Sequence, residues 1–433
     1  MICENIGVNE QGHLTFAGHD TTALAQKYGT PLYLMDEDRI RHNCRLYKKA
    51  MTDAFGAGSF ASYAGKAACF KRIYEIMREE GMSVDLVSPG EIFTAYKAGF
   101  PMEKAFFHGN NKSDEDIILA MDCGVGFIVV DGTDELAAVQ RIAHSRGLRQ
   151  NVLLRLTPGI DPHTYEAVAT GKVDSKFGVA IETGQAEGFV KAALSCENLN
   201  VMGYHCHVGS QVFDDDNSVY FDSADVMLTF AKEMLEKNGY APNILDIGGG
   251  YGVRYTESDP TVDIPKSIAK VASHIRMFCE NKGLPMPNVI MEPGRSIVAD
   301  AGMTLYTAGT VKQITGYKNY LSVNGGMTDN PRYALYGSAY TVYIANKMGQ
   351  SADFSCDLVG RCCESGDVIQ PGIQVPMPER GDIVAVCTTG AYNYSMASNY
   401  NRIPRPALVM LSGGESYVAV RRETLEDLMM NDL

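Results

Sequence analysis

The sequence of 433 residues lacks long apolar runs and has few basic residues relative to acidic ones. No run reaches the roughly 18 apolar residues of a membrane-spanning helix, so we expect no such helix. The 38 Lys and Arg residues against 52 Asp and Glu residues leave a net charge of −14. Nucleic acids and anionic membranes attract basic surfaces, so this charge argues against either as the main partner.

Metal-ligating cysteine pairs and targeting segments are also missing. No two cysteines have C-x-x-C spacing, which argues against a structural zinc site. The 11 cysteines are an odd number spread over the chain, as expected for free thiols in a reducing compartment. The first residues, MICENIGVNEQGHL, lack the basic and apolar parts of a signal peptide. We therefore expect a cytoplasmic protein.

Short apolar runs are what the sequence has instead, and they alternate with segments of helical spacing. The eight runs are residues 59–64, 84–88, 105–108, 127–131, 152–156, 201–207, 244–247 and 289–292. After the first run, ACFKRIYEIMREEG places Ile73, Ile76 and Met77 on one helix face and ends at Gly81. Strands alternating with helices in this number predict an α/β fold with a (β/α)₈ barrel of the TIM type. A doubly wound open sheet is the alternative.

The pattern changes after about residue 300. The segments MTLYTAGTVKQI, KNYLSVNGG, GDIVAVCTTG and SYVAVRR are short β-type runs separated by Gly, Pro and Asn, which predicts an all-β domain. Near the N-terminus, GHLTFAG and TPLYLMD are expected to add strands to it. The predicted division is a barrel over residues 36–300 and a β-domain formed by residues 1–35 and 301–433.

Polar residues and glycines gather where the apolar runs end. In a (β/α)₈ barrel the active site lies at the carboxyl ends of the strands, so these residues are its candidates. They are Lys66, His108, Arg155, His205, His207, Ser210, Gly248, Gly249, Gly250, Glu292 and Arg295. The three consecutive glycines let backbone N–H groups converge on an anion, with a simple tight turn as the alternative. Glu292 and Arg295 on the next loop favour an anionic ligand, because arginine binds phosphate and carboxylate well.

Lys66 is the one charged residue in SFASYAGKAACF. A lysine taken alone is more often a surface or paired residue. An amine, an anion cradle, a carboxylate and a histidine together are what pyridoxal phosphate requires, because it is held through an amine, its phosphate and its pyridine nitrogen. We therefore predict pyridoxal 5'-phosphate as the cofactor.

More than one role is open for three histidines and an arginine at the strand ends. His108 lies either near the cofactor ring or merely in the pocket wall, and Arg155 is either part of a core ion pair or a pocket residue. His205 is expected to pack inside the barrel. His205 and His207 form an H-x-H pair that can bind a metal. No third ligand is evident in the sequence, so we predict no metal site.

Several blocks of sequence carry a family resemblance. YAGKAA, HGNNKS, SKFG, HCHVGSQ, DIGGGYG, EPGRS, CCESGD and GAYNYSMASNYN occur in order between about Thr30 and Pro406. With them the chain resembles the diaminopimelate decarboxylase family, part of the alanine-racemase-like (fold type III) group of pyridoxal-phosphate decarboxylases. The resemblance implies an alanine-racemase-like barrel with a C-terminal β-domain.

The resemblance also implies roles for individual residues. Lys66 would attach the cofactor covalently through an imine, Glu292 would pair with its pyridine nitrogen, and Cys363 would donate a proton. The cofactor ligands it implies, besides Lys66 and Glu292, are His207, Ser210, Gly248, Gly249, Gly250, Gly294, Arg295 and Tyr392. The catalytic residues it implies are Lys66, His207 and Cys363. The substrate ligands it implies are Arg295, Arg332, Tyr336, Glu364 and Tyr392. Cys363 and Glu364 would reach the other subunit's site, which implies an obligate homodimer.

The activity implied is decarboxylation of meso-2,6-diaminopimelate to L-lysine and CO₂, the last step of lysine biosynthesis. Glu292 favours decarboxylation over racemisation, because a carboxylate stabilises a protonated pyridine nitrogen, where racemases of this group are expected to carry arginine. Glu364 after Cys363 favours diaminopimelate, since ornithine-type relatives typically carry Asp there. The alternatives are a related decarboxylase acting on another basic or D-amino acid, a racemase, and a non-catalytic cofactor-binding protein.

Overall fold

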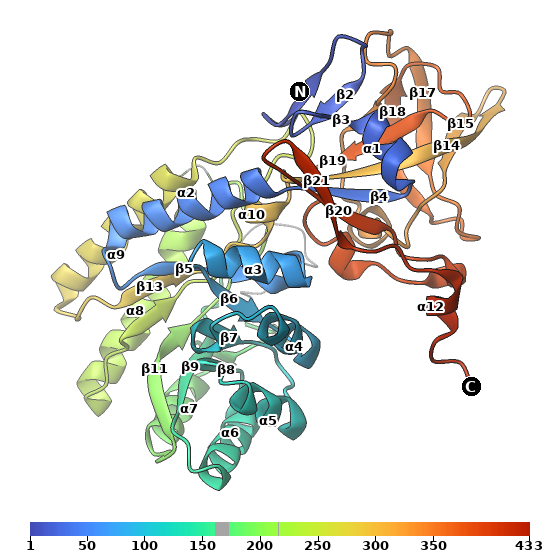
Figure 1. The fold of residues 1–433 in the computed structure, drawn as a ribbon. Helices are drawn as coiled ribbons and strands as arrows, with labels where there is room; N and C mark the ends of the chain where they lie inside the picture. Colours follow the sequence, from blue (N-terminus) through green and yellow to red (C-terminus); the bar gives the residue numbers. More distant parts are fainter. Residues whose placement is uncertain (161–172, 215) are drawn as a thin grey trace. The chain divides into compact units, whose positions relative to one another are not determined.

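The computed structural model describes residues 1–160, 173–214 and 216–433 (Figure 1). The chain divides into two compact units, each described here by itself. The barrel unit comprises Asn43–Gly252 and Thr261–Gly294, and the β unit comprises Met1–His42, Val253–Pro260 and Arg295–Leu433. The helix α2 (Glu37–Phe55) contributes residues to both. The short segment Val253–Pro260 lies between the two parts of the barrel unit in the sequence but belongs to the β unit.

The barrel unit is a closed parallel barrel. In order around it, the strands are β5 (Phe60–Ala64), β6 (Ser83–Leu86), β7 (Ala105–Phe107), β8 (Phe127–Val130), β9 (Gln150–Thr157), β11 (Leu199–His205), β12 (Ile244–Asp246) and β13 (Asn288–Met291). Closure comes from β13 and β5, where Ile290 pairs with Phe60 and Met291 with Ala61. A short extra strand, β10 (Val179–Ala180), pairs parallel with β9. The predicted (β/α)₈ barrel is confirmed, and closure eliminates the open sheet.

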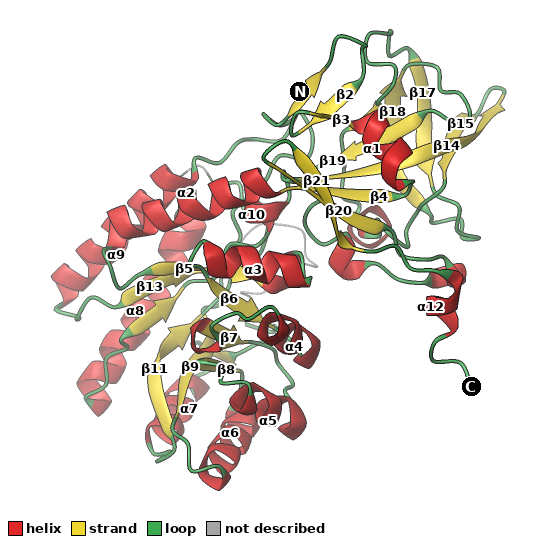
Figure 2. Ribbon diagram, viewed as in Figure 1, coloured by secondary structure: helices red, strands yellow, loops and turns green. Residues whose placement is uncertain are grey.

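Helices follow the barrel strands along the chain and lie outside them (Figure 2). They are α3 (Lys71–Glu79), α4 (Pro89–Lys97), α5 (Asp114–Asp122), α6 (Thr133–Ser145), α7 (Gln185–Leu194), α8 (Ser218–Asn238) and α9 (Ile264–Lys282). In α3 the residues Ile73, Ile76 and Met77 are buried, as the helical spacing predicts. Helix α5 begins at a capping box in which Ser113 and Asp116 satisfy each other's backbone N–H groups. The hydrophobic periodicity and the caps together fix these helices on the barrel.

Large apolar side chains fill the end of the barrel where several strands begin. The rings of Phe106 and Phe127 stack with their centroids 4.4 Å apart. Phe106 belongs to a buried cluster with Val129, Leu153, Ile244 and Ile290, and the partly buried Phe127 packs against it. Such a core ring costs about 3–5 kcal/mol of stability when cut to alanine. The packed end fixes the strands, and the polar side chains are placed at their opposite, carboxyl ends.

The β unit is built on a sheet that joins both ends of the chain. Its strands run in the order β18–β17–β15–β14–β4–β20–β21, and β16 and β19 pair beside β14. The strands are β4 (Leu32–Asp36), β14 (Gly302–Ile314), β15 (Lys318–Val323), β16 (Val342–Ile344), β17 (Phe354–Val359), β18 (Val368–Val375), β19 (Ile383–Cys387), β20 (Ala407–Ser412) and β21 (Glu415–Val420). The N-terminal β4 lies between β14 and β20. TPLYLMD therefore joins this sheet, as predicted.

The remaining elements of the β unit are short. GHLTFAG forms β2 (Leu14–Phe16), which pairs with β1 (Ile6–Val8) and β3 (His19–Asp20) in a separate small sheet. Leu14 and Phe16 are nevertheless buried in the same core as β4 and β14. The helices of this unit are α1 (Thr21–Tyr28), α10 (Arg295–Val298), α11 (Arg332–Tyr336) and α12 (Leu425–Met429).

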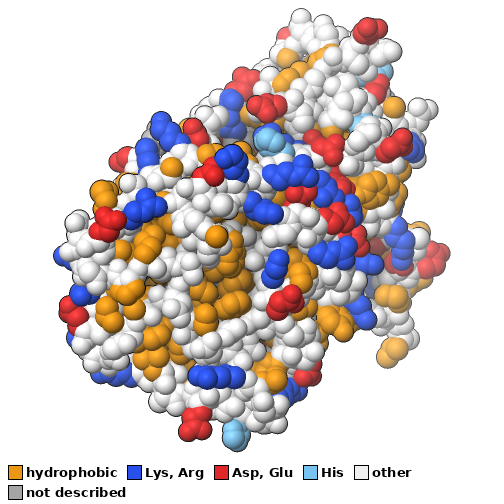
Figure 3. Space-filling view, turned by 60° about the vertical axis from the view of Figure 1, so that its left-hand side comes forward, with side chains coloured by type: hydrophobic (Ala, Val, Ile, Leu, Met, Phe, Trp, Pro, Cys, Tyr) orange, Lys and Arg blue, Asp and Glu red, His pale blue; other side chains and the backbone are white. Residues whose placement is uncertain are grey.

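Within the described ranges, no helix is both long and apolar enough to cross a membrane. On the face seen in Figure 3, basic and acidic side chains are interspersed instead of forming a basic surface. That mixture agrees with the negative net charge of the chain.

Candidate active site

Lys66 lies in a tight turn directly after β5. The turn is a short 3₁₀ helix (Gly65–Ala67), and Lys66 is exposed while Gly65 and Ala67 are buried. A Cβ on Gly65 would meet the Tyr74 hydroxyl at 2.6 Å, so this position requires glycine. A Cβ on Gly294 would lie 2.9 Å from that of Ala64. The loop after β13 therefore packs against the lysine turn, and the amine of Lys66 projects from a rigid support.

The three glycines after β12 form a turn against two neighbouring loops. Gly248 and Gly250 have φ of +71° and +119°, where residues with a Cβ are strained. A Cβ on Gly249 would lie 2.0 Å from the backbone oxygen of Glu292. The N–H of Gly248 donates to Asp246, and that of Gly249 donates to Nδ1 of His207 at 3.3 Å. Two of the three amides predicted to hold phosphate thus already have acceptors inside the chain.

His207 follows β11, and its ring is oriented by the glycine turn. Because Nδ1 accepts from Gly249, the proton of the neutral ring belongs on Nε2. Burial and the positive charge of Lys66 lower the pKa of His207 to about 3, so the ring is neutral at physiological pH. Ser210 follows on the same loop and is half-buried. The structure brings His207 to the glycine turn, a contact that the sequence analysis did not predict.

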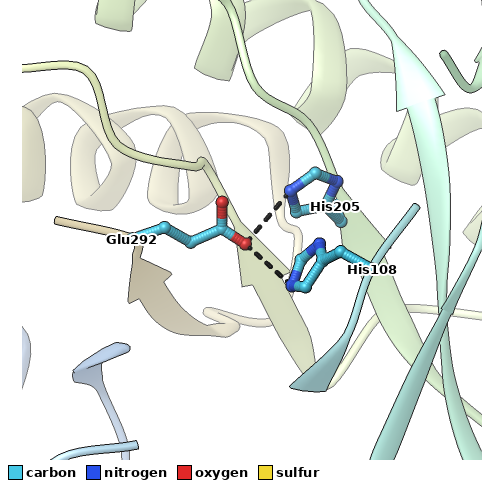
Figure 4. A group of neighbouring side chains, drawn as sticks. All are labelled: His108, His205 and Glu292. Atoms are coloured by element: carbon cyan, nitrogen blue, oxygen red, sulfur yellow. Dashed lines mark ion pairs between the residues drawn. The ribbon is translucent and has the colours of Figure 1, made fainter. Parts of the chain in front are cut away.

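Glu292 directly follows β13 and faces two histidines (Figure 4). Its Oε1 lies 3.2 Å from Nε2 of His108, after β7, and 3.2 Å from Nε2 of His205, at the end of β11. The three ligand atoms lie within 4.8 Å of one another, a grouping that is also able to hold a metal ion. The sequence analysis considered a metal only at the H-x-H pair of His205 and His207, so the absence of a metal site stays a prediction. The grouping pairs His205 with His108 and Glu292, and His207 is not part of it.

The buried carboxyl groups of Asp85, Asp246 and Glu292 differ in the direction in which their pKa values are shifted. Burial and the proximity of Glu292 raise the pKa values of Asp85 and Asp246 well above the ordinary value. Burial alone would also raise the pKa of Glu292, but His108 and His205 outweigh it and hold that pKa well below the ordinary value. The site therefore presents one ionised carboxylate among neutral neighbours, which is suited to binding a cation.

Arg155 and Lys112 have partners at the neighbouring strand ends. Nε of Arg155 lies 3.8 Å from Asp131, and its guanidinium stacks 4.3 Å from the ring centre of Phe177. The amine of Lys112 bonds to Glu135 at 2.8 Å and to two backbone oxygens. Of the two interpretations left open for Arg155, the buried ion pair is the one that the structure supports.

In the β unit, two buried arginines flank one tyrosine. The guanidinium carbon of Arg295 lies 4.8 Å from the ring centre of Tyr392, and that of Arg332 lies 5.3 Å from it. The ring of Tyr336 lies 5.5 Å from Arg332. Arg295 also donates to the hydroxyl of Tyr255 at 2.8 Å. Within the described part of the chain, Nε of Arg332 has no hydrogen-bond partner. The cluster thus offers positive charge and donors to an anionic ligand.

Sequence reasoning missed two aromatic residues of this cluster. Tyr255 accepts from Arg295, and Tyr340 meets the Tyr255 ring edge-on at 5.5 Å between centroids. Burial raises the pKa of Tyr340 to about 12. Tyr255 lies a few residues after the glycine turn, yet nothing in its spacing indicates that it folds with the β unit.

Cys363 and Glu364 lie on an exposed loop between β17 and β18. Their backbone is held firmly, because Cys363 N–H donates to Asn401 and Cys362 N–H donates to Asp367, both at 2.7 Å. Among the residues described, neither side chain pairs with Arg295 or Arg332. The structure therefore does not bring these two predicted residues to the other ones within the β unit.

Comparison with known proteins agrees with this arrangement. The model of the pyridoxal-binding domain of pyridoxal-dependent decarboxylases matches residues 37–299. The chain is 42% identical to the diaminopimelate decarboxylase of Bacillus subtilis, over 98% of this chain and 96% of that protein. The structure of diaminopimelate decarboxylase from M. jannaschii in complex with L-lysine is similar, with a TM-score of 0.91 and 32% identity over 99% of this chain and 98% of that one. That of Helicobacter pylori with L-lysine has a TM-score of 0.86 and 31% identity, over 95% and 98% of the chains.

Proposed function

The chain belongs to the diaminopimelate decarboxylases, within the family of pyridoxal-dependent decarboxylases, and on that premise we propose that it converts meso-2,6-diaminopimelate to L-lysine and CO₂. The observation that carries the proposal is the buried carboxylate of Glu292, kept ionised by His108 and His205. A carboxylate there favours a protonated pyridine nitrogen, which decarboxylation needs. The product follows the relatives whose structures contain L-lysine.

The residues at the strand ends fit pyridoxal phosphate. Lys66 offers an exposed amine for covalent attachment, Glu292 an anionic partner for the ring nitrogen, and the turn at Gly250 a backbone without a Cβ. When bound, the cofactor supplies the electron sink for the pair of electrons left by the loss of CO₂. Gly294 lets the Glu292 loop pack onto the lysine turn.

We assign the remaining barrel residues by what holds them. His207, its ring fixed by the Gly249 N–H, would contact the cofactor ring. Ser210 and Gly250 would hold the phosphate, and Gly248 and Gly249 shape the turn through their bonds to Asp246 and His207. We assign the phosphate to Gly250 because the N–H groups of Gly248 and Gly249 already donate to Asp246 and His207.

The arginine–tyrosine cluster binds the substrate's carboxylates in this proposal. Arg295 and Arg332 each stack near Tyr392, and a guanidinium binds a carboxylate through two parallel hydrogen bonds. Tyr336 and Tyr392 line the same place. Arg295 follows Glu292 by three residues, so the chain links the substrate cluster directly to the partner of the ring nitrogen.

The proton for the product and the ligand for the distal amine come from a second subunit in this proposal. The exposure of Cys363 and Glu364 on a firmly held loop supports it, because an exposed thiol and carboxylate are available to another copy of the chain. The enzyme is then an obligate homodimer with two shared sites. The cysteines of the described residues are all free thiols, which suits a cytoplasmic location.

A substrate panel tests the proposal. Purified protein with pyridoxal phosphate is incubated with meso-diaminopimelate, L-ornithine, L-arginine and several D-amino acids, and CO₂ and products are measured. We expect L-lysine and CO₂ from diaminopimelate at a rate far above the others, and none from Lys66→Ala. Absence of lysine from diaminopimelate, or inversion of a substrate without CO₂, contradicts the proposal.

A further inference from the structure

Tyr340 is a buried phenol beside the arginine–tyrosine cluster of the β unit. Only 3% of it is exposed, and its ring meets the ring of Tyr255 edge-on, with 5.5 Å between the centroids. Tyr255 in turn accepts from Arg295 at 2.8 Å. Burial raises the pKa of Tyr340 to about 12, and the positive charges of Arg332 and Arg295 oppose this rise. Both guanidiniums therefore lie near the Tyr340 hydroxyl, which keeps its proton at physiological pH.

Asn393 determines how the Tyr340 hydroxyl takes part in hydrogen bonds. The amide nitrogen of the fully buried Asn393 side chain lies 3.2 Å from the backbone oxygen of Thr389 and 3.4 Å from the Tyr340 oxygen. A backbone oxygen only accepts hydrogen bonds, so the nitrogen of Asn393 must face it, and not the amide oxygen. The second proton of that nitrogen then goes to the Tyr340 oxygen. The phenolic proton of Tyr340 is therefore directed away from Asn393.

The phenolic proton and one guanidinium N–H are buried donors without acceptors. Within the described residues, the bond from Asn393 is the one hydrogen bond that the Tyr340 hydroxyl makes. In the same part of the chain, Nε of Arg332 has no partner either. An unpaired buried donor costs free energy, so two of them near one another indicate a ligand that accepts from both. A carboxylate suits this place, because it accepts several hydrogen bonds and carries the charge that arginine attracts.

The stereochemistry of the proposed reaction identifies which carboxylate this is. Meso-diaminopimelate has one L centre and one D centre, and L-lysine retains the L centre. The carboxylate lost as CO₂ is therefore the one at the D centre. The carboxylate at the L centre is present in substrate and product alike, so it is available for binding contacts away from the bond that breaks.

We propose that Tyr340 donates its phenolic proton to the carboxylate at the L centre, beside Arg332, and so selects ligands that carry this carboxylate. The inference rests on the proposed function. Asn393 is then a positioning residue, since its amide nitrogen turns the phenolic proton toward the ligand. A ligand that lacks the carboxylate leaves the O–H of Tyr340 and Nε of Arg332 buried and unpaired, which a site built on hydrogen bonds penalises. Tyr340 thus adds to the preference for diaminopimelate over amino acids with a single carboxylate.

Tyr340→Phe tests the proposal, because it removes the hydroxyl and keeps the ring against Tyr255. Dissociation constants for L-lysine and for pentane-1,5-diamine, which lacks any carboxylate, are measured by calorimetry on the holoenzyme. We expect the constant for L-lysine to rise about ten- to a hundredfold, as for a lost hydrogen bond to a charged group, and that for the diamine to change less than about twofold. A merely structural role of the hydroxyl would weaken both ligands. Unchanged binding of L-lysine, or an equal loss for both ligands, overturns the inference.

A control variant and a structure complete the test. Tyr204 packs against Phe230, and its buried hydroxyl also has no hydrogen-bond partner among the described residues. Tyr204→Phe should leave both constants unchanged, and a loss equal to that of Tyr340→Phe overturns the inference. A crystal structure of the wild-type holoenzyme with L-lysine should place the Tyr340 oxygen about 2.5–3.0 Å from a carboxylate oxygen, and a separation above about 3.5 Å overturns it.

The substrate panel separates this inference from the proposed function. A protein that makes no lysine, yet binds L-lysine more weakly after Tyr340→Phe, contradicts the proposed function alone. A protein that makes lysine and binds it equally with and without the Tyr340 hydroxyl contradicts the present inference alone. A wild-type holoenzyme that does not bind L-lysine contradicts both.

Discussion

Asp85, Asp246 and Glu292 are buried near one another, yet among these three only Glu292 has a pKa held below its ordinary value. The difference lies in their surroundings, because two buried imidazoles lie 3.2 Å from Glu292, while Asp85 and Asp246 lie near the negative charge of Glu292. The same functional group, a buried carboxyl, is thus neutral at two positions of the barrel and ionised at a third. Contacts between residues far apart in the sequence thus influence which carboxyl group is ionised.

The guanidinium of Arg332 is expected to matter through its geometry as well as its charge. Arg332→Lys keeps the charge but loses the planar pair of donors, so KM for diaminopimelate should rise by about ten- to a hundredfold with a smaller change in kcat. Steady-state lysine formation measures both. Arg141→Lys, at an exposed ion pair with Asp114, is the control and should leave KM unchanged. Equal kinetics for the Arg332 and Arg141 variants would show that Arg332 does not bind the substrate.

Asp329 makes stability depend on pH in the β unit. Burial raises its pKa to about 7, against about 4 in an unfolded chain. Between these values the folded state holds a proton that the unfolded state has released, so the free energy of unfolding falls as pH rises, by up to about 1.4 kcal/mol per pH unit. Urea unfolding at pH 4 to 7 should show this slope, and Asp329→Asn should flatten it. The exposed control, Asp353→Asn, should keep the slope of the wild type, and an equal slope in Asp329→Asn refutes the assignment.

The elements of the barrel were predictable because each carries its own pattern. Buried runs bounded by helical segments indicate strands, and the spacing of Ile73, Ile76 and Met77 indicates the inner face of α3. Closure of the barrel, in contrast, does not follow from these local patterns. It rests on pairings such as the bond from Val289 N–H to Ser59 Oγ, between residues 230 positions apart. A local pattern holds no record of such a contact, so an open sheet remained possible until the structure was known.

The same limit explains which site residues were found. Lys66, His207 and Glu292 stand in short blocks that the family resemblance identifies. The contacts of His108 and His205 with Glu292 arise from three different strands, so the sequence left His108 open and assigned His205 to packing. Tyr255 was missed because its segment folds with the β unit although its neighbours along the chain belong to the barrel.

At the level of a single turn, Gly249 is expected to be irreplaceable for steric reasons. A Cβ there would lie 2.0 Å from the backbone oxygen of Glu292, so Gly249→Ala should destabilise the protein by about 1–3 kcal/mol and weaken cofactor binding. Gly188 in α7 is the matched control, because its Cβ would meet nothing within 4 Å. Gly188→Ala should stabilise by about 1 kcal/mol through its helix propensity. Urea unfolding and bound cofactor per chain measure both; equal behaviour of the two variants would contradict the packing argument.

At the scale of the whole molecule, the exposed loop of Cys363 and Glu364 allows two arrangements of the active site, one within a single chain and one shared between two subunits. If each site is complete within one chain, two defects in different chains cannot repair each other. If Cys363 of the partner subunit completes the site, one chain lacking Lys66 and another lacking Cys363 together form one intact site per mixed dimer. The proposed function requires the second arrangement.

Mixing two inactive variants decides between these arrangements. Lys66→Ala and Cys363→Ala homodimers are each expected to be nearly inactive, the first without covalently held cofactor and the second with it. After subunit exchange at equal concentrations, half of the dimers are mixed and each has one intact site, so activity should return to about a quarter of the wild type. Size-exclusion chromatography checks that the mixture is dimeric, and mixing Lys66→Ala with Lys66→Arg controls for exchange alone. Activity that stays at the level of the separate variants, despite verified exchange, places Cys363 within its own chain's site or outside the chemistry.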